Sequence, residues 1–283
     1  MSDEYPLPNE PSTKGMLRGI VCTTPWKETK AQRDLADDLS RWFDCPVVRR
    51  NDRSILAVCT DEGVETVVVA DGVPKVYRKS TPDAPIFFHP GMAFLRIQGM
   101  LRGETDRLVR AAGIEPGMTV LDATLGGGTD TLTLAHAVGD GGLVIACEVE
   151  PVLFNLFRYA KAHGFAPYSE LACLAERIEL VGMHHLDWLR GMPDDSADVV
   201  YFDPMFRTES LGRSAGMDAL RMFTHPDPLS MEAVSEAKRV ARQSVIVKER
   251  PMSREFRRLG LTVDKPRAKL AYGVWWKGEA VDC

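Results

Sequence analysis

The chain of 283 residues lacks several features that would place a protein in a class at once. Its six cysteines are scattered and include no Cys-x-x-Cys pair, so we expect free thiols rather than disulfides or metal ligands. Its longest apolar stretches, such as Val199–Phe202, fall short of the roughly 20 residues that span a bilayer. The acidic, polar N-terminus is unlike a secretory signal. These absences predict a cytoplasmic protein with no membrane segment and no metal site.

Extreme charge is also lacking. The formal net charge is −5 and 45% of the residues are hydrophobic, which excludes a mainly disordered chain. The slight acidic excess argues against a protein that coats nucleic acid without specificity, although a local basic cluster can still bind a polyanion. At the usual ~100–200 residues per domain, the length predicts one large domain or a large one with a smaller one.

The first third of the chain predicts a small α/β module over residues 15–85, preceded by a flexible lead-in over residues 1–14 that is rich in proline. Apolar residues of the segment 30–44 recur at helical spacing. Asp71-Gly72 is a turn signal that closes a hairpin. The expected strands of this module lie at 19–24, 46–48, 54–58, 66–70 and 74–78.

Residues 86–283 show strand patterns that alternate with helical lengths. The expected strands lie at 119–122, 143–148, 178–181, 198–203, 244–248 and 270–276, and the expected helices at 104–112 and 151–163. Such alternation is typical of βαβ units. The fold class is therefore predicted to be α/β, with a mostly parallel, Rossmann-like sheet covered by helices on both faces.

A glycine turn after the first strand of this sheet is the most informative segment. The strand ends at Asp122, Gly126 and Gly128 form the turn, and a helix is expected to begin near Thr131. Glycine is needed where the backbone takes a positive φ or lies against a ligand. Ligands of open α/β sheets bind at this edge. Glu148 ends the next strand, where a carboxylate can bind a ribose diol.

The glycine turn allows three interpretations: a turn that binds no ligand, a dinucleotide site and an S-adenosylmethionine site. The sequence lacks the Gly-x-Gly-x-x-Gly fingerprint of dinucleotide sites, and Asp130 at the start of the helix disfavours a pyrophosphate by charge repulsion. Asp122 and the following glycines instead resemble the Asp-x-Gly-x-Gly-x-Gly signature of class I S-adenosylmethionine-dependent methyltransferases. That resemblance implies S-adenosylmethionine as cofactor.

Asp203-Pro204-Met205-Phe206 follows the expected fourth strand, counted from the one that ends at Asp122. It resembles the (Asn/Asp)-Pro-Pro-(Tyr/Phe) motif of methyltransferases that act on exocyclic amines of nucleobases, although Met205 replaces the second proline. Such an amine is a poor nucleophile, because its lone pair is delocalised into the ring. A carboxylate and an aimed carbonyl can accept its N–H groups, and an aromatic ring can stack on the base. The bland alternative is an ordinary turn.

The motifs together resemble the small-subunit ribosomal RNA guanine-N2 methyltransferases of the RsmJ family and their Gram-positive relatives, over roughly 89–251. The resemblance implies 16S ribosomal RNA as the partner. It implies that Glu148 binds the ribose, that His184 and His185 lie beside the adenine, and that Asp203 faces the transferred methyl. The implied catalytic residues are Asp203, Pro204 and Phe206. The implied cofactor-binding residues are Asp122, Thr124, Gly126, Gly128, Thr129, Asp130, Glu148, Val149, His184, His185 and Asp203.

Three groups of residues each allow two interpretations. His184 and His185 are not expected to form a metal pair, because adjacent side chains should point apart, and they can be ordinary loop histidines. The basic residues from Lys248 to Lys269 either contact phosphates or form a solvated face. Residues 207–228 have the length of a lid or substrate clamp.

The function itself also keeps alternatives. One is a methyltransferase with another substrate, such as DNA adenine, tRNA or a small molecule. The other is a non-catalytic nucleotide-binding or RNA-binding protein of the same fold. The joint presence of Glu148 and Asp203 favours an enzyme, because a binding protein does not need both. The target nucleotide and the oligomeric state are left open.

Overall fold

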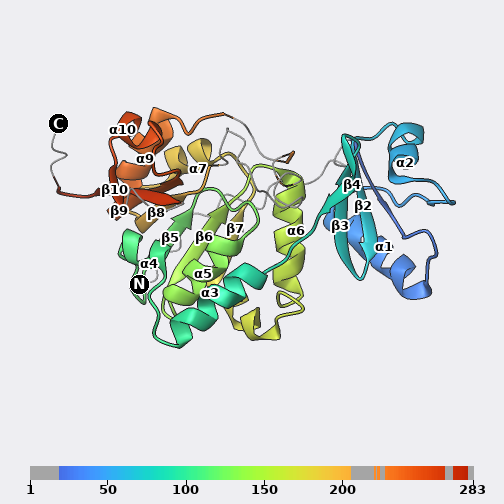
Figure 1. Cartoon of the computed structure of the whole chain (residues 1–283), viewed down its shortest axis with the longest axis horizontal. Helices are drawn as coiled ribbons and strands as arrows, with labels where there is room; N and C mark the ends of the chain where they lie inside the picture. The colour runs from blue at the N-terminus through green and yellow to red at the C-terminus, as the bar shows by residue number, and fades with distance from the viewer. Residues whose placement is uncertain (1–18, 205–219, 221, 224–226, 265–269, 280–283) are drawn as a thin grey trace. The chain divides into compact units, whose positions relative to one another are not determined.

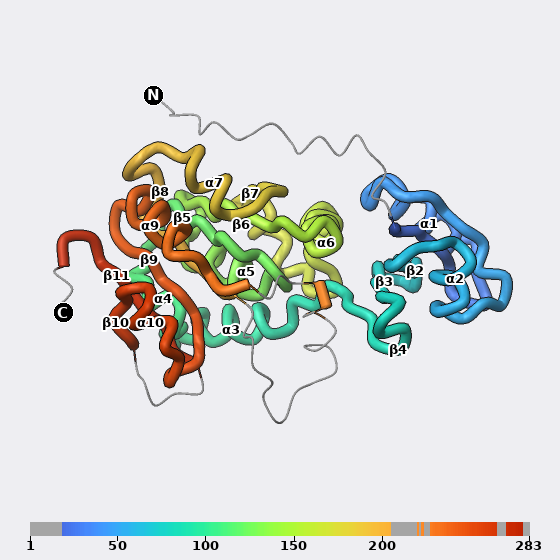
Figure 2. The backbone as a smooth tube through the Cα atoms, turned by 90° about the horizontal axis from the view of Figure 1, so that it is seen from above, coloured from blue at the N-terminus to red at the C-terminus, as the bar shows by residue number. Residues whose placement is uncertain are grey.

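The computed structural model describes residues 19–204, 220, 222–223, 227–264 and 270–279 (Figures 1 and 2). The chain divides into two compact units. Unit 1 comprises residues 1–89, 150–159 and 210–224, and unit 2 comprises residues 90–149, 160–209 and 225–283. The expected lead-in over residues 1–14 lies outside the described residues.

Unit 1 contains a four-stranded sheet of order β1-β2-β3-β4 with a helix on each face. Val68 and Ala70 of β2 join the core around α1, whereas Val67 and Val69 join the core around α2. A strand buried on both faces explains the continuous apolar run. The elements are β1 (Ile20–Thr23), α1 (Lys30–Trp42), α2 (Ile55–Asp61), β2 (Thr66–Asp71), β3 (Val73–Arg78) and β4 (Thr81–Ile86).

Most of the elements predicted for unit 1 are confirmed, and two strands are wrong. Residues 54–58 begin helix α2, where Ser54 is the N-cap and its side chain accepts a hydrogen bond from Ala57 N. The buried residues Ile55, Val58 and Cys59 lie at helical spacing, which outweighs the strand preference of β-branched side chains. Residues 46–48 make a single bridge, from Val47 to Cys22.

Unit 2 contains a seven-stranded sheet of order β10-β11-β9-β8-β5-β6-β7. The five strands from β9 to β7 are parallel, and β11 and β10 are antiparallel to their neighbours. This arrangement confirms the predicted Rossmann-like α/β fold. The strands are β5 (Thr119–Asp122), β6 (Leu143–Cys147), β7 (Ile178–Val181), β8 (Ala197–Phe202), β9 (Ala241–Glu249), β10 (Thr262–Asp264) and β11 (Ala271–Trp276).

Helices cover both faces of this sheet, with α3, α4 and α5 on one face and α7 and α9 on the other (Figure 2). Helix α4 ends at Ala112, as the sequence predicts, with Gly113 in the left-handed conformation as its C-cap. Helix α3 was not predicted. The helices are α3 (Gly91–Leu101), α4 (Arg107–Ala112), α5 (Thr129–Ala137), α6 (Pro151–Ala162), η1 (Ser169–Arg177), α7 (His185–Gly191), α9 (Met231–Val240) and α10 (Glu255–Arg258).

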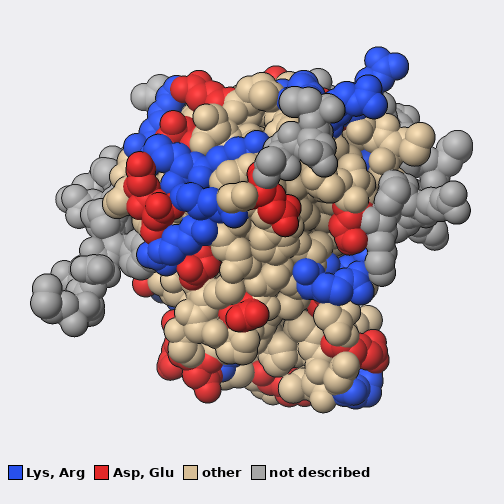
Figure 3. Space-filling model, turned by 90° about the vertical axis from the view of Figure 1, so that its left-hand side faces the viewer, with Lys and Arg blue, Asp and Glu red and all other residues tan. Residues whose placement is uncertain are grey.

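The parallel strands place their carboxyl ends at one edge of the sheet. Asp122, Glu148 and Asp203 therefore lie at the same edge, at or directly after the ends of β5, β6 and β8. Within the described part of the chain, no helix is both long and apolar enough to cross a membrane. Figure 3 shows a band of lysine and arginine side chains, with acidic residues between them, on the side of unit 2 where α9, α10 and β10 lie.

Candidate active site

The turn between β5 and α5 is an open glycine loop. Gly126 has φ +51° and Gly128 has φ +74°, both in the left-handed region that favours glycine. Among the described residues, a Cβ at Gly126 would meet only the Thr124 carbonyl oxygen, 3.8 Å away, so these residues leave this side of the loop open to a ligand. Gly126 N donates to Glu148 Oε2 at 2.9 Å, which joins the loop to the end of β6.

Asp122 holds the glycine loop from inside. Its side chain is buried, and its oxygens accept hydrogen bonds from Thr124 N at 3.1 Å and from Thr131 Oγ1 at 2.6 Å. Burial and, less strongly, the charges of Asp130 and Asp203 raise the pKa of Asp122 to about 7, although the two hydrogen bonds lower it. Both carboxylate oxygens are thus engaged within the protein, so the geometry gives Asp122 a role in shaping the loop.

Thr124 joins the glycine loop to the Asp203-Pro204 segment. Its Oγ1 accepts a hydrogen bond from Asp203 N at 2.6 Å, and the neighbouring Ala123 N donates to Tyr201 O at 2.9 Å. A glycine at position 124 could not make the first of these bonds. This contact gives a physical reason for threonine where the general signature has glycine.

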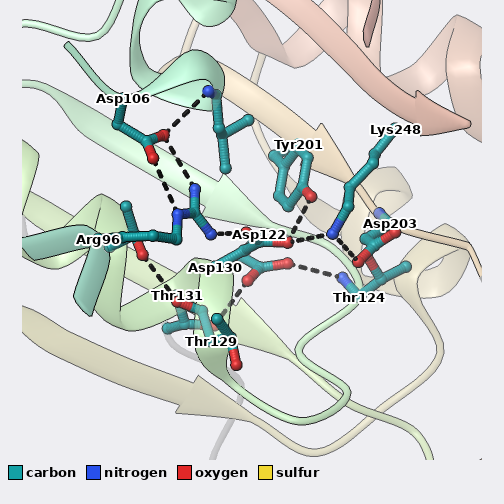
Figure 4. A network of polar contacts seen from close by, with 12 residues as sticks. Arg96, Asp106, Asp122, Thr124, Thr129, Asp130, Thr131, Tyr201, Asp203 and Lys248 are labelled. Carbon is teal, nitrogen blue, oxygen red and sulfur yellow. Dashed lines mark hydrogen bonds and ion pairs between the residues drawn. The ribbon is translucent and has the colours of Figure 1, made fainter. Parts of the chain in front are cut away.

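A partly buried charge network, in which Asp130 and Tyr201 are buried, connects four elements (Figure 4). Asp130 Oδ2 accepts from Tyr201 Oη at 2.7 Å and from Lys248 Nζ at 2.9 Å, and its Oδ1 accepts from Arg96 Nη1. Lys248 Nζ also donates to Asp203 Oδ2 at 2.7 Å. Arg96 reaches further, with a two-bond contact to Asp106 at 2.8 and 2.9 Å.

The network gives its aspartates different ionisation. Burial raises the pKa of Asp203 to about 6, because the lowering by Lys248 is outweighed by burial and by Asp130. Burial also acts on Asp130, but Lys248 and Arg96 hold its pKa below the ordinary value. Lys248 has a raised pKa despite burial, because it faces both carboxylates. At neutral pH, Asp203 is therefore an ionised carboxylate close to its titration range.

The structure corrects two expectations from the sequence. Asp130 is not a free charge that repels a pyrophosphate, because Arg96 and Lys248 neutralise it. Lys248 is neither a phosphate contact nor part of a solvated face, because its side chain is 17% exposed and paired with two aspartates. Its position directly after the apolar run 245–247 was a signal of an inward-facing cation. Arg96 and Tyr201 were missed, and no local pattern singles them out.

The predicted adenine contacts lie after β7. His184 is the N-cap of α7, and its Nδ1 accepts from Leu186 N at 3.2 Å. The two imidazole rings lie 4.2 Å apart between centroids, so the expectation that they point apart is wrong. His185 packs edge-on against Phe202 at 5.7 Å, and burial lowers its pKa to about 4. Among the described residues, no cluster of three His, Cys, Asp or Glu could hold a metal ion.

The remaining predicted residues are only partly placed. Thr129 is the first residue of α5, and Val149 is exposed after β6. Pro204 directly follows Asp203 at the end of a described segment. Phe206 lies outside the described residues, as do Met205 and most of the expected lid over residues 207–228.

The hydrogen-bond acceptors at this edge of the sheet fit S-adenosylmethionine. The cofactor carries a ribose diol and an ammonium group, which require acceptors, and no phosphate. Glu148 lies beside the open side of Gly126 and accepts the Gly126 N–H, and an ionised carboxylate can accept up to about four hydrogen bonds. Asp203 lies across the loop, bound through Thr124.

Comparisons with known proteins agree with this geometry. Residues 78–267 match the family described as "Putative SAM-dependent methyltransferase". The chain is 33% identical over 255 residues to the uncharacterized protein YpiP of Bacillus subtilis, covering 90% of this chain and 98% of that one. It is 26% identical to ribosomal RNA small subunit methyltransferase J of Marinobacter nauticus, covering 87% and 86% of the two chains.

Two further relatives agree in part. The chain is 30% identical over 149 residues to ribosomal RNA small subunit methyltransferase J of Pseudomonas syringae, and spans about half (51%) of that protein. The crystal structure of the methyltransferase NGO1261 from Neisseria gonorrhoeae matches with a TM-score of 0.56 and 17% identity, over 92% of this chain and 97% of that chain, and so shows the fold. The chain therefore belongs to a family of class I S-adenosylmethionine-dependent methyltransferases of the RsmJ type, and its cofactor is S-adenosylmethionine.

Proposed function

We propose that this methyltransferase acts on an exocyclic amine of a nucleobase, namely guanine N2 in 16S ribosomal RNA. The position of Asp203 carries the proposal. Its N–H is bound by Thr124, its carboxylate is bound by Lys248, and it follows β8 at the edge where the cofactor loop lies. A carboxylate fixed at two points can hold an amine in one orientation.

The residues of the site divide the work of transfer. S-adenosylmethionine supplies the methyl group, with its sulfur keeping the electron pair of the broken bond, while the amine nitrogen uses its lone pair for the new bond and loses one proton. Asp203 accepts an N–H of the amine, orients the lone pair and takes this proton, which then passes to solvent. Pro204 fixes its own φ and restricts the backbone of the preceding Asp203. Phe206 stacks on the base, and Glu148 and Val149 contact the nucleoside of the cofactor.

Two observations support ribosomal RNA as the substrate class. Relatives that span half or more of this chain carry the name ribosomal RNA small subunit methyltransferase J. The band of basic side chains on unit 2 offers positive charge to phosphates (Figure 3). We further propose that residues 15–85 form a module separate from the catalytic domain over 86–283, in keeping with the compactness of unit 1, and that the protein works in the cytoplasm.

Transfer of a labelled methyl group tests the function. The substrates are 16S RNA, assembled small subunits, tRNA and DNA from cells that lack this protein, and the product is identified by nucleoside mass spectrometry. We expect N2-methylguanosine in 16S RNA or small subunits, approaching one methyl per molecule. Label in another base, in tRNA or in DNA would replace the proposed substrate. Binding of cofactor and RNA without any transfer would favour a non-catalytic protein.

A further inference from the structure

Lys248 lies between two carboxylates that face the same space. Its Nζ is 2.7 Å from Asp203 Oδ2 and 2.9 Å from Asp130 Oδ2, and its side chain is 17% exposed. Figure 4 shows the ammonium between the two acids. This position does not fit the phosphate contact that was one interpretation of this lysine. A cation in this position is bound too closely to serve an external anion.

The two acids do not depend on Lys248 equally. Asp130 has a second cation in Arg96 and a neutral donor in Tyr201. Asp203 is bound through its carboxylate by Lys248 and through its backbone by Thr124. Asp130 therefore retains a charge partner without Lys248, whereas Asp203 would keep its like-charged neighbours and lose the cation that the structure places on it.

We propose that Lys248 is a positioning residue whose ammonium keeps the Asp203 carboxylate ionised and oriented toward the substrate amine, with Asp130 as the opposing charge. The proposal rests on the proposed role of Asp203 as the amine acceptor. Lys248 acts through Asp203 and need not touch the substrate.

Among the described residues, the titratable and charged groups that act on Asp203 or on its partners come from several elements. Lys248 on β9, Asp130 on α5, Asp122 on β5 and Tyr201 on β8 interact with Asp203 itself. Tyr272 on β11, Arg96 on α3 and Asp106 before α4 interact with Asp130, Lys248 or each other, and His185 on α7 packs against the neighbouring Phe202. Both tyrosines have raised pKa values, and His185 has a lowered one, so these three are neutral near pH 7. Among these groups the cations are Arg96 and Lys248, and Arg96 binds Asp130 and Asp106.

Carbon-13 NMR of the aspartate carboxyl groups tests this without substrate or cofactor. The Asp203 signal is assigned as the one lost in Asp203→Asn, and its titration is followed in otherwise unchanged protein. In the wild type we expect a midpoint near 6. In Lys248→Met the midpoint should rise by roughly one to three units, because an opposite charge at this distance lowers a carboxyl pKa by about that much.

A second variant must move the midpoint in the opposite direction. Asp130→Asn removes the like charge beside Asp203, and Asp203 becomes the one carboxylate of the two that still pairs with Lys248. The Asp203 midpoint should therefore fall below the wild-type value. Lys248→Arg keeps the charge and should restore most of the wild-type midpoint. Lys277→Met is the matched control, since Lys277 pairs with Asp195 near the opposite edge of the sheet and should leave the midpoint unchanged.

The outcomes separate this inference from the proposed function. An Asp203 midpoint that stays within a few tenths of a unit in Lys248→Met, or that falls, overturns the role of Lys248 even when ribosomal RNA is methylated. If Lys248→Met does not fold, Asp130→Asn still decides, because an Asp203 midpoint that stays at the wild-type value or rises in that variant contradicts the proposal. With a working substrate, the acid limb of kcat/KM should move with the NMR midpoint in each variant.

Discussion

At the scale of single residues, three aspartates within one site differ in the ionisation that their surroundings impose. Asp122 is buried with hydroxyl and amide donors, and its pKa rises to about 7. Asp203 shares one lysine with a second acid, and its pKa rises to about 6. Asp130 has two cations, and its pKa falls. Such separation of like groups is frequent where acids take different roles in one reaction.

Replacing the proposed acceptor tests the chemistry. Asp203→Ala should lower kcat by at least about 100-fold, the usual cost of losing one fixed polar group at a reacting centre. Cofactor affinity should stay within a few-fold, because Glu148 and the glycine loop remain. Steady-state kinetics and calorimetry with S-adenosylmethionine measure the two effects. Unchanged turnover would remove Asp203 from the mechanism.

Replacing a loop glycine tests the pocket. Gly126→Val should abolish measurable cofactor binding, because its side chain would project into the open space beside the loop. Valine at position 126 also strains the backbone, because φ is +51°. Gly139→Val is the matched control, because Gly139 has a similar φ of +66° and room for a side chain but follows the other end of α5. Calorimetry should show binding lost only in the first variant. Normal affinity of Gly126→Val would contradict the assignment of the pocket.

At the scale of elements, the loops after β5 and β8 behave as one unit because Thr124 binds Asp203 N. Thr124→Val keeps the shape and leaves this N–H without its partner. We expect a loss of about 1–3 kcal/mol in the free energy of unfolding, together with lower kcat. Thr124→Ser keeps the hydroxyl and should stay close to the wild type in both. Denaturant unfolding and kinetics of the two variants measure the difference, and equal behaviour would show that the contact is dispensable.

Substitutions at helix α10 test whether the basic face of unit 2 binds RNA. Arg258 is held by Glu255 and by the Leu229 carbonyl oxygen, whereas Arg254 and Arg257 are exposed. Reversing Arg254 and Arg257 to Glu should weaken RNA binding and reduce the slope of log affinity against log salt by about two. Arg41→Glu on α1 is a control for charge reversal elsewhere. An unchanged slope would return these residues to the interpretation as a solvated face.

At the scale of the whole molecule, buried acids make stability depend on pH. Asp122 has a higher pKa in the folded state than the ordinary 3.8, so the folded state binds its proton more tightly than the unfolded state between about pH 4 and 7. The stability that Asp122 contributes is therefore present at low pH and is lost as the pH rises through this window. Asp122→Asn does not titrate, and its Oδ1 can still accept from Thr124 N while its Nδ2 can donate to Thr131 Oγ1.

Comparing the wild type with Asp122→Asn isolates the contribution of Asp122 to the pH dependence of the free energy of unfolding. The free energy of unfolding of the wild type, relative to Asp122→Asn, should decline as the pH rises from about 4 to about 7. Urea unfolding at a series of pH values gives this difference directly. A difference that stays flat, or that grows with pH, would show that Asp122 is ionised throughout.

Local patterns in the sequence determined most of the strands, the glycine loop and the family. These depend on neighbours along the chain: alternation or continuity of apolar residues, glycine at turns, and a carboxylate at each strand end. The same reasoning failed at Ser54, because an N-cap followed by β-branched residues has two local solutions. Packing against β2 selects the helix.

Only the tertiary structure decided which charges meet. Asp130 binds Arg96, Tyr201 and Lys248, which lie 34, 71 and 118 positions away in the chain. The order β9-β8-β5 and the placement of α3 beside α5 bring them together. A buried ion is stable only with partners, and partners can come from any distance along the chain. The sequence by itself therefore located the glycine loop, whereas the folded sheet decided that Lys248 pairs with Asp130 and Asp203.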